Sequence, residues 1–153
     1  MKEENLTTQR NEGFAIYHDL PINASMARVF EAITEPDQLV NWWPAACSGE
    51  PRMGAEYNFY FGPEYDWYAK VIEVKQNKAF YIEMTKSDQD WNGTTFGFDL
   101  HLKQDKVQLQ FWHKGWPQCN EHFRRSSFCW AMLLQGLKNY AEKGLIIPFE
   151  KRE

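Results

Sequence analysis

The segment EHFRRSSFCWAMLLQGLKNY, residues 121–140, is the part of the sequence most informative about the fold. Apolar and small residues recur in it at spacings of three and four, which is typical of one face of an amphipathic α-helix. The positions on this face are Phe123, Ser127, Trp130, Leu134, Leu137 and, just beyond the stretch, Ala141. Short aromatic segments of strand character precede it, so we expect a β-sheet that curls around one long helix.

Upstream of this helix, the pattern predicts one strand, two short helices and about five further strands. Residues 14–20 read as the first strand, and Asn23 or Ser25 caps the helix that follows. Pro36 ends that helix and starts a second one, which Pro44 ends. The later strands are expected at residues 55–61, 67–74, 79–84, 94–102 and 107–113. This order predicts an α+β fold, in which a curved antiparallel sheet wraps around the long C-terminal α-helix and two short helices follow the first strand.

Length and composition are those of one globular domain. The chain has 153 residues, and we divide it into a polar lead-in at 1–13, a single domain at 14–147 and a C-terminal tail at 148–153. Its 7 Trp, 7 Tyr and 11 Phe residues favour a β-rich fold, because large rings suit pleated surfaces and apolar pockets alike.

Charge and cysteine usage exclude several classes of protein. The net charge is −4 and no long basic run occurs, which argues against a nucleic-acid-binding module. No segment stays apolar for the ~18 residues that a membrane span needs. The three cysteines are odd in number and match no disulfide scaffold, so we expect a cytoplasmic protein.

Five segments, in their order along the chain, resemble the START and birch-pollen-allergen superfamily of helix-grip folds. They are ASMARVFEAI at 24–33, PDQLVNWW at 36–43, MGAEYNF at 53–59, HKGW at 113–116 and WAMLLQGLKNY at 130–140. Within the superfamily, they are most similar to the branch named after activators of the ninety-kilodalton heat-shock chaperone's ATPase. The resemblance implies a cavity between sheet and helix. It does not fix the function, because the superfamily includes lipid carriers, hormone receptors, polyketide cyclases and chaperone partners.

The inward faces of the strands and of the long helix supply the candidate ligand-binding residues. These are Trp43, Tyr57, Phe59, Phe98, Leu109, Phe111, His113, Trp116, Trp130 and Leu134. If the sheet stands off from the helix, they line a pocket with few polar groups, as small-molecule sites usually are. The alternative is that the same rings fill the space at ordinary core density.

Two features of this set carry further expectations. The alternation of its strand places His113 inward, where it either orients a polar ligand group or is a core histidine that a tyrosine or a backbone carbonyl satisfies. We favour the core histidine, because no carboxylate partner lies nearby in the sequence.

Trp42 and Trp43 are adjacent on the second short helix, where neighbours point about 100° apart, so we expect only one of them to face inward.

Motifs for covalent chemistry, metals and cofactors are absent from the sequence. There is no nucleophile elbow and no glycine-rich phosphate loop. The four histidines and three cysteines lack the paired spacing of a structural zinc site, so we assign no catalytic residue, metal or cofactor. We therefore hypothesise that the protein binds a small, mostly apolar molecule. One alternative is a protein-interaction module related to the chaperone activators, with a chaperone or homodimer contact, and another is a cyclase-like enzyme that uses Tyr57, Tyr68 or His113.

Overall fold

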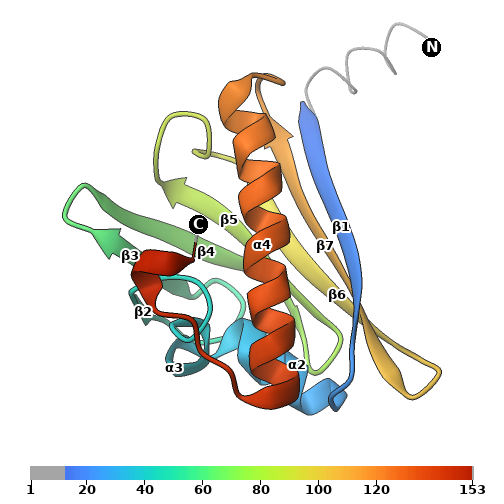
Figure 1. Cartoon of the computed structure of the whole chain (residues 1–153). Coiled ribbons are helices and arrows are strands. Elements are labelled where there is room, and N and C mark those ends of the chain that lie inside the picture. Colours follow the sequence, from blue (N-terminus) through green and yellow to red (C-terminus); the bar gives the residue numbers. More distant parts are fainter. Residues whose placement is uncertain (1–12, 153) are drawn as a thin grey trace, which may run out of the picture.

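A seven-stranded antiparallel sheet curves around one long helix in the computed structural model, which describes residues 13–152 (Figure 1). The strand order is β1-β7-β6-β5-β4-β3-β2. In chain order, the elements are β1 (Phe14–Ile22), α2 (Met26–Thr34), α3 (Pro36–Leu39), β2 (Ala46–Ser48), β3 (Glu56–Gly62), β4 (Tyr65–Lys75), β5 (Ala79–Lys86), β6 (Thr95–Lys103), β7 (Lys106–Trp116), α4 (Glu121–Lys143) and the 3-10 helix η1 (Phe149–Lys151). The predicted helix-grip fold is confirmed. The lead-in expected at 1–13 lies outside the described residues except for Gly13.

Helix α4 forms where the sequence predicts it, and both of its ends have caps. The Asn120 side chain accepts a hydrogen bond from the backbone N–H of Phe123, and Gly144 ends the helix with a φ of 71°. The face toward the sheet buries Trp130, Leu134 and Leu137. The helix therefore lies on the concave side of the sheet and closes the core there (Figure 1).

The second short helix is shorter than the sequence predicts. Helix α3 is one turn and ends at Leu39, and the chain then passes through turns to Pro44. Trp42 and Trp43 are both buried, so the expectation that only one faces inward is wrong. The rule of 100° between neighbours holds only on a helix, and the Trp42 indole is fixed by donating from Nε1 to the Ala32 carbonyl at 2.9 Å.

The sheet joins its first strand to its last strand. Strand β1 pairs antiparallel with β7, residues 14–22 against 107–116. The predicted alternation on β7 is confirmed, because Val107, Leu109, Phe111 and His113 are all buried. Strand β2, which the sequence analysis missed, is a three-residue edge strand that pairs with β3 and is too short to show an alternation.

Gly97 allows two large rings to cross the outer face of the sheet. A Cβ at this position would lie 2.6 Å from Tyr81 Cδ1 and would also collide with the Trp112 ring. Those two rings pack edge to face at 4.9 Å, and both donate to Asp99, Tyr81 from its hydroxyl at 2.5 Å and Trp112 from Nε1 at 3.2 Å. The glycine therefore supplies room for packing, on strand β6 beneath the two rings.

We expect Gly97→Ala to lower the free energy of unfolding by about 1–3 kcal/mol, because the added methyl displaces the Tyr81 and Trp112 rings from their packed positions. Urea denaturation followed by tryptophan fluorescence measures this change. Gly136→Ala is the matched control, since no atom outside the adjoining helix backbone and neighbouring residues lies within 4 Å of a Cβ there. In the interior of α4 that substitution should stabilise by up to about 1 kcal/mol. Equal effects of the two substitutions would contradict the packing argument.

Candidate functional site

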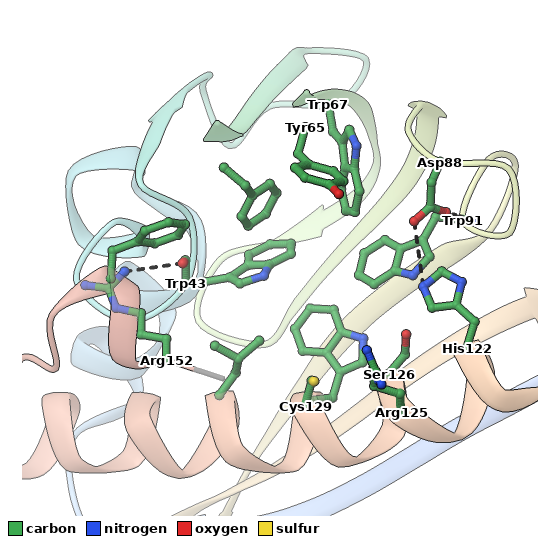
Figure 2. Close-up of a pocket in the computed structure, with 14 residues that line it drawn as sticks. Trp43, Tyr65, Trp67, Asp88, Trp91, His122, Arg125, Ser126, Cys129 and Arg152 are labelled. Atoms are coloured by element: carbon green, nitrogen blue, oxygen red, sulfur yellow. Dashed lines mark hydrogen bonds and ion pairs between the residues drawn. The ribbon is translucent and has the colours of Figure 1, made fainter. Parts of the chain in front are cut away.

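A pocket of about 440 Å³ opens beside α4, on the side where β3 and β4 lie (Figure 2). Its walls come from the turn after α3, from the β3–β4 hairpin, from the loop between β5 and β6, from α4 and from the C-terminal segment. The residues that line it are Trp43, Phe61, Tyr65, Trp67, Asp88, Trp91, His122, Arg125, Ser126, Cys129, Trp130, Leu133, Phe149 and Arg152. Segments that are far apart in the sequence therefore share one cavity.

Tryptophan rings in mutual contact make the floor of this pocket. Trp130 stacks on Trp91 with centroids 5.8 Å apart and lies 5.0 Å from Trp43. Trp67 extends the surface, 5.0 Å from Trp91. Trp43, Trp91 and Trp130 are all at least nine-tenths buried, so the floor belongs to the hydrophobic core and is rigid.

Charged groups gather at one end of the pocket, where α4 begins. His122 Nδ1 lies 2.8 Å from Asp90 Oδ2, and its Nε2 lies 3.7 Å from Asp88 Oδ2. These contacts tie the first turn of α4 to the loop between β5 and β6. Figure 2 shows Asp88 and His122 on the same side as Trp91, with Arg125 and Ser126 on the helix below.

The C-terminal segment forms the opposite end, and Arg152 holds it in place. The guanidinium donates from Nε to the Ile147 carbonyl at 2.8 Å and from Nη1 to the carbonyls of Trp43 at 3.3 Å and Pro44 at 3.4 Å. Phe149 packs near Phe61, with ring centroids 6.5 Å apart. The described part of the expected tail is thus folded against the pocket, while the domain boundary at residue 147 stays a prediction.

The ten residues predicted to bind a ligand are all buried, and two of them line this pocket. These two are Trp43 and Trp130. The other eight, which lie in the core and do not line it, are Tyr57, Phe59, Phe98, Leu109, Phe111, His113, Trp116 and Leu134. Rings fill the space between sheet and helix, as the 4.4 Å between the Phe111 and Trp130 centroids illustrates. Ligand binding by these eight residues stays a prediction.

The lining residues outside α4 were hard to place from the sequence, because most of them lie on hairpin ends, in a loop or in the tail. Those on α4 that were not predicted, such as Arg125 and Leu133, flank the predicted apolar face of the helix. Tyr65 follows the β3–β4 turn, Trp91 lies in the loop at residues 87–94, and Phe149 lies in η1. Such segments have no periodicity that says which way a side chain points. A tryptophan in an otherwise polar loop was the one available signal, since loops are usually polar and exposed.

His113 is a core histidine with a complete set of hydrogen bonds. Trp130 donates from Nε1 to His113 Nδ1 at 3.1 Å, so the ring carries its proton on Nε2 and donates to Thr94 Oγ1 at 2.9 Å. Thr94 in turn donates to the Trp91 carbonyl at 2.6 Å. The partners are thus an indole and a hydroxyl, in place of the expected tyrosine or backbone carbonyl. Burial, and to a smaller extent the nearby His122, lowers the pKa of His113 to about 3.

Two absences hold for residues 13–152. No cluster of three or more histidine, cysteine, aspartate or glutamate side chains there is placed to hold a metal ion. Over the same residues, no helix is long and apolar enough to cross a membrane.

We expect the neutral His113 to make stability depend on pH between about 6.5 and 3. Because its pKa is lower in the folded state than in the unfolded state, the unfolded chain binds the extra proton in this window. Its stabilising contribution is therefore complete above pH 6.5 and is lost as the pH falls, by up to about 1.4 kcal/mol for each pH unit.

Urea denaturation over this range should show a shallower loss of stability for His113→Gln than for the wild type. The glutamine carries both a donor and an acceptor but does not titrate. His101→Gln is the control, because it makes the same substitution at an exposed side chain near the end of strand β6. Parallel curves for the wild type and His113→Gln would show that His113 is not the titrating group.

Comparison with known proteins gives the family. The family model described as "Activator of Hsp90 ATPase homolog 1-like protein" matches residues 23–142. Among solved structures, the Aha1 dimer from Colwellia psychrerythraea is 26% identical, with a TM-score of 0.78 over 86% of this chain and 98% of that one. Among curated proteins, none matches the sequence significantly.

Two more distant structures share the fold. A protein from Staphylococcus saprophyticus is 16% identical, with a TM-score of 0.75 over 88% of this chain and 96% of that chain. CalU16 from Micromonospora echinospora is 15% identical, with a TM-score of 0.69 over 90% and 82% of the two chains. The family model covers well over half of the sequence, and its match agrees with the helix-grip architecture. The chain therefore belongs to the family of Activator of Hsp90 ATPase homolog 1-like proteins.

Proposed function

We propose that this protein binds a small, mostly apolar molecule in the pocket beside α4. The observation that carries the proposal is the pocket itself, whose volume of about 440 Å³ falls within the range of small-molecule sites. Half of its lining residues are aromatic: Trp43, Phe61, Tyr65, Trp67, Trp91, Trp130 and Phe149. Flat apolar walls of this kind favour a ligand that presents rings or hydrocarbon.

Sequestration from water is the mechanism that this geometry supports. Burial of apolar ligand surface contributes about 25 cal/mol for each Å² removed from water. The floor is already ordered, because Trp130 is held by its hydrogen bond to His113 and by packing on Phe111. Binding of a ligand on this floor therefore costs little free energy for ordering the protein, which is the benefit of a preorganised site.

Self-association through α4 is a second candidate function. Phe128 and Met132 lie one turn apart on the outer face of this helix and are 66% and 40% exposed. Large apolar side chains on an exposed helix face are typical of protein contacts. The Colwellia psychrerythraea relative is described as a dimer, which supports the same assignment for this chain. The name of the family makes a chaperone the other partner to test.

We expect the pocket to bind 2-naphthylmethanol, a neutral probe of two fused rings, and to raise the melting temperature, because the probe binds only the folded state. Trp67→Ala should weaken the binding measured by isothermal titration calorimetry about tenfold, since it removes one aromatic wall. The control is Trp112→Ala, a tryptophan of similar burial that lies on β7 and does not line the pocket.

Native mass spectrometry of the freshly purified protein is the companion measurement, in which a bound mass identifies the natural ligand. Absence of a bound mass, together with a melting temperature that no apolar probe raises, would overturn the proposal. Equal weakening by Trp67→Ala and Trp112→Ala would move the site away from this pocket.

For the second candidate, we expect the wild type to run as a dimer in size-exclusion chromatography with light scattering at micromolar concentration. Phe128→Ser should shift it to the monomer, because the substitution removes the largest exposed apolar side chain of α4. Met53→Ser, at a 55% exposed side chain away from α4, is the control. A wild type that stays monomeric at high concentration rules this candidate out.

A further inference from the structure

The charges around the pocket do not balance, and the excess is positive. Among residues 13–152, Asp88 is the one carboxylate that lines it, and this group faces His122 at 3.7 Å. Two arginines, Arg125 and Arg152, also line it, and neither forms an ion pair with a residue between 13 and 152. An aromatic pocket with two unpaired guanidinium groups favours a ligand that brings a negative charge.

Arg152 is the better placed of the two arginines. Arg125 is exposed at the start of α4, on the side of Asp88 and His122, where water and neighbouring carboxylates weaken its field (Figure 2). Arg152 is half-buried at the opposite end of the pocket, away from those carboxylates (Figure 2). An anion at the Arg152 end would therefore meet a cation without meeting Asp88.

Three backbone carbonyls fix the Arg152 guanidinium and leave part of it unused. Its Nε and Nη1 donate to the carbonyls of Ile147, Trp43 and Pro44. Its Nη2 donates to no described residue, so two N–H groups are free to bind an acceptor. Carbonyl oxygens hold the group in position but carry no full charge to neutralise it. Burial lowers the pKa of Arg152 because the charged form is partly desolvated, and the Glu150 carboxylate opposes this to a smaller extent.

We propose that the ligand of this pocket is an aromatic molecule that carries one anionic group, such as a carboxylate, and that the anionic group pairs with Nη2 of Arg152. The rings lie on the floor of Trp43, Trp91 and Trp130, and the anion lies toward the C-terminal segment. This inference rests on the proposed function, since it assigns a chemical class to the ligand of the same pocket. Charge-assisted hydrogen bonds to a preorganised guanidinium are among the stronger polar contacts in proteins.

Two probes that share one ring system test the charge directly. They are 2-naphthoate, which is anionic, and 2-naphthylmethanol, which is neutral, each titrated by calorimetry into the wild-type protein. We expect the wild type to bind 2-naphthoate about tenfold more tightly. The cationic 2-naphthylmethylammonium should bind more weakly than either. Equal affinity for the anionic and the neutral probe would overturn this inference and leave the proposed function standing, whereas failure of all three probes to bind would overturn both.

Variants then assign the preference to one residue. In Arg152→Gln, the ratio of the two dissociation constants should fall to about one. Because this variant also loosens the C-terminal segment, the ratio is the proper readout, since a damaged wall weakens both probes together. Lys151→Gln removes the same charge one residue away, from an exposed side chain that does not line the pocket, and should keep the tenfold preference. A preference that survives in Arg152→Gln would overturn the assignment to Arg152.

Discussion

The hydrogen bond from Trp130 Nε1 to His113 Nδ1 joins the long helix to the sheet that grips it. It crosses the core between α4 and β7, where an unpaired indole N–H or imidazole nitrogen would cost about 1–3 kcal/mol. Its geometry orients the Trp130 ring, and that ring contacts Trp43, Phe96 and Phe111. Trp130 therefore belongs both to the core and to the pocket floor. The position of the site follows from the way the helix is anchored.

This anchor also explains why some of the structure was predictable from the sequence. Helix α4 and the inward positions of β7 have strong periodicity, and periodicity reports which face is buried. That is how Trp130, His113 and Phe111 were placed inside correctly. Periodicity cannot report whether facing rings leave a void, because this depends on side-chain rotamers and on the distance between layers. Facing rings close the space between β7 and α4, and the pocket lies on the side of α4 where β3 and β4 are.

The walls of the pocket other than α4 come from parts of the chain that carry little such pattern. Trp43 lies in the turns after α3, and Trp91 comes from a polar loop. Arg152 directly follows the 3-10 helix η1, and its position depends on hydrogen bonds to distant carbonyls. Contacts between residues more than 100 positions apart cannot be read from local sequence.

The site also combines a well-packed part with a less well-packed part. Its floor is part of the core. The C-terminal segment at the other end of the pocket has exposed apolar residues and few buried contacts, so local opening costs the least free energy there.

The pairing of β1 with β7 also has a consequence for synthesis on the ribosome. The partner of β1 is made some 85 to 100 residues later, since residues 14–22 pair with residues 107–116. At translation speeds of about 5–20 residues per second, β1 waits roughly 5–20 s with its backbone hydrogen-bonding groups unpaired. An unpaired strand is a template for association with other nascent chains. The pairing of the first strand with the last thus leaves β1 exposed for most of the time that the domain takes to emerge.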